Sequence, residues 1–256
     1  MPESYAGSYK RLETIMLELR DKCPWDKKQT IQSLRKLTIE ETYELADAID
    51  ENDLDNIKEE LGDLLLHIIF YARIGEEQGV FDMRDVVRTV CDKLVHRHPH
   101  IYDKTEVDDA EEVKRNWESL KIKEGKKTVL GGVPKSLPAM VKAFRLQEKA
   151  KQVGFEWETD EQVKDKIDEE WEEFEVEKKA NDKKKMEQEF GDVLFSMINY
   201  ARFLDIDPEA ALEKTNKKFI RRFNAMEAIA TDQVDDMSQL SLTELDAIWN
   251  TIKTNE

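Results

Sequence analysis

The amino-acid sequence predicts an all-α fold made of two tandem helical-bundle modules related by internal duplication. Three observations support this prediction. Only 9 of the 256 residues are glycine and 6 are proline, while 38% are charged. Apolar residues recur at every third or fourth position, which places them on one face of a helix. The second half of the chain also repeats motifs of the first half.

The repeat is clearest in two acidic segments of each half. Residues 39–45 read IEETYEL where residues 168–174 read DEEWEEF, and residues 60–64 read ELGDL where residues 189–193 read EFGDV. The offsets 168 − 39 and 189 − 60 both equal 129. A match without gaps over this span indicates that one module was duplicated.

A group of helix-breaking residues separates the two copies. It comprises Gly131-Gly132-Val133-Pro134, with Pro138 close behind, in a chain that otherwise contains few such residues. We therefore expect a first module over residues 1–130, a linker over residues 131–139 and a second module over residues 140–256.

Each module is expected to contain four longer helices and a short closing helix. In the first module the apolar periodicity predicts helices over Ser8 to Leu19, Ile31 to Asp50, Asp53 to Glu77, Met83 to Arg97 and Ala110 to Lys123. In the second module it predicts helices over Met140 to Gln152, Thr159 to Ala180, Asp182 to Phe203, Pro208 to Met226 and Ser241 to Lys253. The Asn-Asp pairs at 52–53 and 181–182 supply turn and capping residues, so the flanking helices should form antiparallel hairpins.

The composition narrows the class of partner. A formal net charge of −17 argues against binding to a nucleic-acid polymer, although a divalent cation can bridge an acidic protein to a phosphate ligand. The two cysteines are too few for a disulfide framework. No apolar run approaches the roughly 20 residues of a membrane span, and residues 1–10 lack the apolar core of a signal peptide. We expect a cytoplasmic protein that does not bind a membrane.

Each module places four carboxylates on two neighbouring helices. Acidic residues three positions apart share a helix face, and an antiparallel hairpin can bring two such pairs opposite each other. A single glutamate on a charged helix needs no explanation beyond solubility, but four converging carboxylates repel one another unless cations neutralise them. Oxygen ligands suit Mg²⁺, with Mn²⁺ as an alternative. The two sets are Glu41, Glu44, Glu60 and Asp63 in the first module and Glu170, Glu173, Glu189 and Asp192 in the second.

These motifs resemble those of the MazG family of nucleoside triphosphate pyrophosphohydrolases over nearly the whole chain. The shared segments are Cys23-Pro24-Trp25-Asp26, Glu40 to Glu44, Glu169 to Glu173, the two ExGD motifs at 60–63 and 189–192, and Lys218 to Phe223. The resemblance implies an all-α homodimer, with sites formed by helices of paired modules, that hydrolyses a nucleoside triphosphate to the monophosphate and pyrophosphate. It also implies a role in controlling nucleotide pools.

The resemblance further implies roles for individual residues. Glu170, Glu173, Glu189 and Asp192 would bind Mg²⁺. A second site would use the corresponding acids of the first module together with Lys93 and Arg97. Either Glu169 or one of the ligands would orient or deprotonate the attacking water. The residues expected to contact the nucleotide are Lys166, Lys185, Gln188, Lys218, Arg222 and Trp249.

The distribution of cations favours the second module as the main catalytic one. A triphosphate beside four carboxylates needs positive charge in addition to the metals. Lys166 and Lys185 each precede a carboxylate by four residues and so lie one helical turn from it. Their counterparts in the first module are Leu37 and Asn56, which carry no charge.

Two alternatives remain open at the level of sequence. The first module keeps its four acids, so it is a second candidate for catalysis. The second alternative is that the chain is a helical sensor or adaptor, which binds a nucleotide without hydrolysing it. Pyrophosphate release from separate halves and from the whole chain discriminates among these readings.

Overall fold

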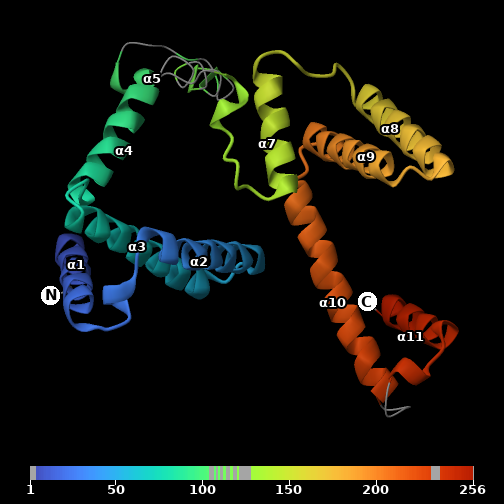
Figure 1. Ribbon diagram of the computed structural model, residues 1–256, viewed down its shortest axis with the longest axis horizontal. Helices are drawn as coiled ribbons and strands as arrows, with labels where there is room; N and C mark the ends of the chain where they lie inside the picture. The colour runs from blue at the N-terminus through green and yellow to red at the C-terminus, as the bar shows by residue number, and fades with distance from the viewer. Residues whose placement is uncertain are drawn as a thin grey trace. The chain divides into compact units, whose positions relative to one another are not determined.

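The computed structural model describes residues 4–103, 107, 109, 112, 113, 116, 117, 120, 128–231 and 237–255. Every regular element in these ranges is helical, so the all-α prediction is confirmed (Figure 1). The chain divides into two compact units, Met1–Val113 and Lys114–Glu256. Within the described ranges, no helix has both the length and the apolar character needed to span a membrane.

The first unit follows the predicted order of helices. The predicted closing helix over Ala110 to Lys123 lies largely outside the described residues, and the short helix after Arg97 was not predicted. The elements are α1 (Tyr5–Lys22), the 3-10 turn η1 (Asp26–Lys28), α2 (Ile31–Glu51), α3 (Leu54–Glu77), α4 (Met83–Arg97) and α5 (Pro99–Tyr102).

The second unit repeats this order. Its fourth helix is longer than predicted, because Met226 and Ala230 near its end are buried against the closing helix. The elements are η2 (Leu130–Gly132), α7 (Ala139–Gln152), α8 (Asp160–Ala180), α9 (Lys183–Phe203), α10 (Pro208–Thr231), η3 (Met237–Gln239) and α11 (Leu242–Thr254). The linker predicted over residues 131–139 stays a prediction.

The same turn joins the two acidic helices of each unit. Asn52 and Asn181 end their helices in the left-handed conformation, with φ of 55° and 53°. Asp53 then accepts hydrogen bonds from the backbone N–H groups of Asp55 and Asn56, and Asp182 accepts one from Lys185. These turns fold α2 onto α3 and α8 onto α9.

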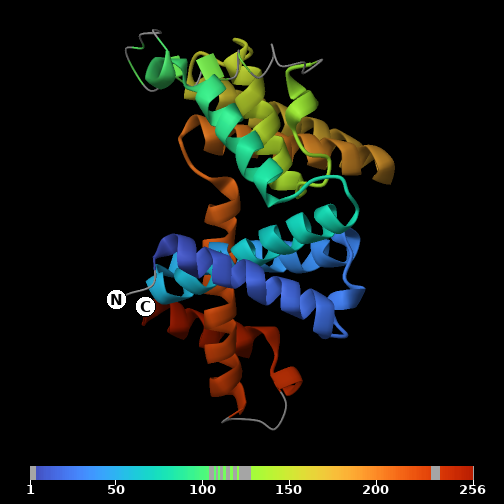
Figure 2. The same ribbon diagram turned by 90° about the vertical axis from the view of Figure 1, so that its left-hand side faces the viewer.

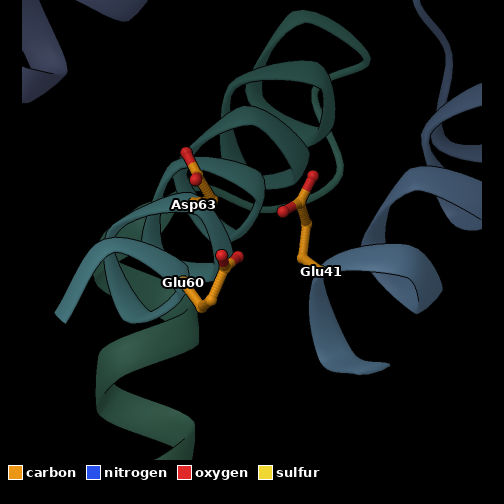
Figure 3. Close-up of side chains that lie close together, drawn as sticks. All are labelled: Glu41, Glu60 and Asp63. Atoms are coloured by element: carbon orange, nitrogen blue, oxygen red, sulfur yellow. The ribbon is translucent and has the colours of Figure 1, made fainter. Parts of the chain in front are cut away.

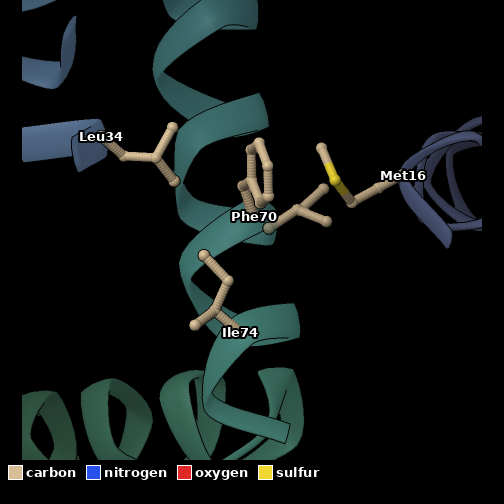
Figure 4. Close-up of a cluster of buried hydrophobic side chains, with 5 residues drawn as sticks. Met16, Leu34, Phe70 and Ile74 are labelled. Carbon is tan, nitrogen blue, oxygen red and sulfur yellow. The ribbon is translucent and has the colours of Figure 1, made fainter. Parts of the chain in front are cut away.

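The core of the first unit lies where α1, α2 and α3 meet. Its buried side chains are Met16, Leu34, Ile69, Phe70 and Ile74 (Figure 4). Phe70 is only 2% exposed, between Leu34 of α2 and Met16 of α1. This core fixes how the α2–α3 hairpin sits on α1.

The second unit has a separate small core between α10 and α11, made of Met226, Ala230 and Ile248. Figures 1 and 2 show that the α10–α11 pair extends away from the α8–α9 hairpin. Helix α7 packs against α9 at the other end of this unit. The acidic hairpin therefore has α7 on one side and no contact of similar extent with α11.

Candidate metal and nucleotide site

Three carboxylates of the second module meet across the α8–α9 hairpin. One oxygen of each of Glu170, Glu173 and Glu189 lies within 4.8 Å of the others. Glu170 is buried, Glu189 is half-buried and Glu173 is exposed. Asp192 lies outside this trio but lines a cavity together with Glu170.

The pKa of Glu189 shows the electrostatic strain among the carboxylates of the second module. Burial raises the pKa of Glu189, and the negative charges of Glu173, Asp192 and Glu170 raise it further. A cation would relieve this repulsion, and a set of carboxylate oxygens is the donor chemistry that Mg²⁺ and Mn²⁺ prefer. The residues therefore fit a hard divalent cation.

Lys166 belongs to the carboxylate cluster. Its Nζ lies 2.7 Å from Glu170 Oε1 and 3.0 Å from Glu169 Oε2. The hydrogen bond to Glu170 is the main reason that the pKa of Lys166 is raised. Lys166 therefore stays protonated and cancels part of the cluster's negative charge.

The two other predicted nucleotide contacts on α9 lie at the solvent-exposed edge of the hairpin. Lys185 Nζ is 3.3 Å from Glu177 Oε1, so its ammonium pairs across the hairpin with α8. Gln188 is exposed one turn further along the helix. Neither residue belongs to the trio of carboxylates.

The remaining predicted contacts lie on the α10–α11 pair. The Arg222 guanidinium lies 6.0 Å from the centroid of the Trp249 ring, and Trp249 packs against the small core. Lys218 is exposed on α10. None of these three residues lines the cavity or joins the trio. In the described part of the chain, these three residues lie on the α10–α11 pair, which extends away from the α8–α9 hairpin (Figure 1).

The first module forms its own trio from a different subset of its acids. Oxygens of Glu41, Glu60 and Asp63 lie within 4.8 Å of one another, with Glu41 on α2 and the other two on α3 (Figure 3). Glu44 stays outside this trio, although its charge raises the pKa of both Glu41 and Glu60.

The predicted basic pair of the first module lies on α4. Lys93 is exposed, and Arg97 is half-buried in the last turn of that helix. Neither residue belongs to the trio of Glu41, Glu60 and Asp63. Leu37 stands at the position that corresponds to Lys166, so this trio has no charged counterpart of that lysine.

A cavity of about 630 Å³ opens beside the carboxylates of the second module. Glu170, Asp192 and Lys166 line one part of it, and aromatic side chains line another. The other lining residues are Leu130, Leu146, Gln147, Ala150, Gly154, Phe155, Glu156, Trp157, Phe195, Ser196, Asn199 and Arg202. This volume is within the range of small-molecule binding sites.

In the first module, larger buried side chains occupy two of the corresponding positions. Asn199 and Ser196 lie 129 residues after Phe70 and His67, which is the offset of the acidic motifs. Phe70 is in the core, and His67 is buried with its Nδ1 2.8 Å from Thr38 Oγ1. Two larger side chains of the first module thus stand at the positions where Ser196 and Asn199 line a cavity in the second module.

The sequence analysis named Lys166, Glu170 and Asp192 but missed the other polar residues of the cavity. Asp192, Ser196 and Asn199 are spaced by four and three positions on α9, so their side chains share one face of the helix. They form a polar stripe on a helix that is otherwise rich in apolar residues. This stripe is the signal that could have revealed them. Gln147 and Glu156 lie on other elements and carry no such pattern.

The fold and the site define a tandem all-α protein with a carboxylate cluster in each module and a cavity beside one cluster. The model of the MazG nucleotide pyrophosphohydrolase domain matches residues 29–102 and 158–227. The chain therefore belongs to the MazG family.

Full-length relatives support this membership. The chain is 43% identical to the nucleoside triphosphate pyrophosphohydrolase/pyrophosphatase MazG of Thermotoga maritima, over 96% of this chain and 95% of the relative. It is 40% identical to the nucleoside triphosphate pyrophosphohydrolase of Escherichia coli K12, over 96% of this chain and 97% of the relative.

The crystal structure of a mazG-related protein from Thermotoga maritima matches 44% of this chain and 98% of its own, with 30% identity and a TM-score of 0.40.

Proposed function

We propose that this protein is a Mg²⁺-dependent hydrolase that converts nucleoside triphosphates, with ribose or deoxyribose, to the monophosphate and pyrophosphate. The names of its relatives in Thermotoga maritima and Escherichia coli support the reaction. The observation that carries the proposal is the cavity of about 630 Å³ lined by Glu170, Asp192 and Lys166. A nucleotide in this cavity has carboxylates and an ammonium group at its phosphate end.

In this proposal the second module is the catalytic one. Glu170, Glu173, Glu189 and Asp192 hold Mg²⁺, which when bound neutralises phosphate charge and makes a water molecule more acidic. The first module has a comparable trio, but the buried Phe70 and His67 occupy positions that line the cavity in the second module. That difference favours a structural or metal-binding role for the first module.

Lys166 has two tasks in the proposed site. It fixes the orientation of Glu170 and Glu169 through hydrogen bonds, and it supplies positive charge beside the phosphates. Glu169 is 57% exposed in its side chain and, within the described part of the chain, pairs with this lysine alone, through Oε2. Its free oxygen is thus available to orient or deprotonate a water molecule, a task that a ligand carboxylate would otherwise perform.

We further propose that two copies of the chain form a homodimer in which one copy supplies Lys218, Arg222 and Trp249 to the site of the other. The α8–α9 hairpin leaves Trp171, Phe190 and Met197 about half exposed, which is unusual for large apolar side chains unless a partner covers them. A Cβ atom added at Gly191 on the same hairpin would meet no heavy atom within 4 Å. The space around this glycine is open to a second chain.

The test is pyrophosphate release from ATP and a panel of deoxynucleotides, with and without Mg²⁺. We expect release only with the metal, and none from a Glu170→Ala variant whose circular dichroism matches the wild type. Glu172→Ala on the same helix is the matched control, because Glu172 is exposed and outside the trio. Full activity of Glu170→Ala would refute the site.

The same assay tests the alternative of a non-hydrolytic nucleotide sensor. A sensor would bind nucleotide in a titration calorimeter and release no pyrophosphate under any metal condition. The hydrolase is expected to act in the cytoplasm and to regulate nucleotide pools there. Metabolite levels in cells with and without the active chain measure that role.

A further inference from the structure

The cavity beside the carboxylates of the second module contains polar groups that the proposed reaction at the phosphates does not use. Gln147 is only 7% exposed, and its Nε2 donates a hydrogen bond of 2.8 Å to the backbone carbonyl of Phe195. Since a carbonyl can only accept, this bond determines which end of the amide is nitrogen. The remaining atom, Oε1, is buried and has no hydrogen-bond partner.

A second amide on the cavity wall has the opposite polarity. Asn199 Oδ1 accepts hydrogen bonds of 3.1 and 2.8 Å from Nε and Nη2 of Arg202. The N–H groups of Asn199 are therefore the part of its amide left to donate. Arg202 itself is 6% exposed and is held on its other side by Glu156, at 2.7 Å.

The buried amide of Gln147, with its unused acceptor, is costly without a ligand. An acceptor buried without a partner destabilises a protein by about 1 to 3 kcal/mol. The cavity also has aromatic walls, because Trp157 and Phe155 line it and remain 43% and 82% exposed. Exposed aromatic faces beside one acceptor and one donor match a planar heterocycle with polar edges.

We propose that this cavity receives the base of the nucleotide, and that Gln147 and Asn199 discriminate between bases by accepting and donating one hydrogen bond each. The proposal rests on the proposed hydrolase function, since it describes the far end of the same site. Trp157 and Phe155 supply stacking surfaces that accept any base. Arg202 and Glu156 are positioning residues, because they hold the amide of Asn199 in one orientation.

Two substitutions distinguish recognition of the base by hydrogen bonds from packing of the base against the cavity wall. Asn199→Asp keeps the oxygen that Arg202 requires and replaces the donor with an acceptor. Gln147→Leu has a similar size and removes the acceptor. Cytosine and uracil are equal in size and carry opposite groups at positions 3 and 4, so they report on the polarity of the wall. Gln152→Leu on the same helix is the matched control, because Gln152 is exposed and does not line the cavity.

The measurement is kcat/KM for CTP and for UTP with the full-length chain in Mg²⁺. We expect the CTP to UTP ratio to change about tenfold in the same direction for the two variants, because an acceptor and a donor that face positions 3 and 4 complement the same base. The ratio should stay constant in Gln152→Leu. The inhibition constant of inorganic tripolyphosphate, which has no base, should be the same in the wild type and in Gln147→Leu.

Different failures of this experiment have different meanings. If both ratios stay within twofold of the wild type, or move in opposite directions, the two amides do not recognise the base as one acceptor and one donor, and the inference is wrong. If the wild-type chain releases no pyrophosphate from any nucleotide, the proposed function itself fails. Circular dichroism and thermal melting of each variant identify a loss that is due to unfolding.

Discussion

Phe70 offers a direct test of how the two modules differ. Phe70 is 2% exposed and packs in one cluster with Met16, Leu34 and Ile74, so Phe70→Ala removes an aromatic side chain from the core shared by α1, α2 and α3. A buried phenylalanine removes about 200 Å² from water, and at about 25 cal/mol per Å² this area is worth about 5 kcal/mol as an upper estimate. Measured losses for such substitutions are about 3 to 5 kcal/mol.

Urea unfolding measures this loss. With a slope of about 1 to 3 kcal/mol per molar urea, a loss of about 4 kcal/mol moves the midpoint of the first module's transition by about 2 M. Leu54→Ala at the start of α3 is the control, because Leu54 is 78% exposed, and it should move the midpoint by less than about 0.5 M. The transition of the second module should stay in place.

The same variant tests which module carries the activity. If the site is in the second module, Phe70→Ala releases pyrophosphate at the wild-type rate in the absence of urea. Activity that declines in parallel with the unfolding of the first module would refute this assignment. A midpoint that hardly moves would refute the account of the core.

Three further predictions concern the homodimer, Gly191 and the loss of stability at low pH. Mixing the inactive Glu170→Ala and Arg222→Ala variants should restore up to about a quarter of the wild-type activity. About half of the dimers are then mixed, and each mixed dimer contains one intact site of two. If no activity returns after subunit exchange, each chain builds its own site. Gly191→Ala should weaken self-association as measured by analytical ultracentrifugation. The helicity of the chain should stay the same or rise, since alanine stabilises a helix relative to glycine by about 1 kcal/mol. An unchanged dimer dissociation constant would place the interface elsewhere. Hydrogen bonding to Arg20 holds the pKa of Glu77 below its ordinary value, so the stability that Glu77 contributes is present above that ordinary value and is lost as the pH falls through the lowered pKa. Glu77→Gln should therefore be less stable by about 1 to 2 kcal/mol at pH 7 and should lose less stability on acidification, as followed by thermal melting from pH 7 to pH 3.

Helix positions were predictable because they depend on neighbours in the chain. The ends of α4, α7 and α8 lie within one residue of the predicted ones. The Asn-Asp pairs at 52–53 and 181–182 cap and terminate helices through contacts that span only a few residues. Apolar periodicity and capping are local properties, so a single sequence contains them in full.

The subset of acids that meets in each hairpin was not predictable. Both modules have the same spacing, but the second gathers Glu173 and leaves Asp192 outside, whereas the first gathers Asp63 and leaves Glu44 outside. Spacing on one helix tells which residues share a face. The rotation of one helix against another decides which of these side chains touch, and packing between helices sets that rotation.

The sequence by itself determined that the chain is all-α, that it is duplicated, and that each module carries acidic pairs on adjacent helices, because these properties follow from residue spacing along the chain. Only the tertiary structure decided that a cavity lies beside the second cluster and that Lys185 pairs with Glu177 across the hairpin. It also decided that Lys218, Arg222 and Trp249 lie on a helix pair extending away from that site. Cavities and long-range ion pairs depend on how helices far apart in sequence pack together, and no local pattern encodes that packing.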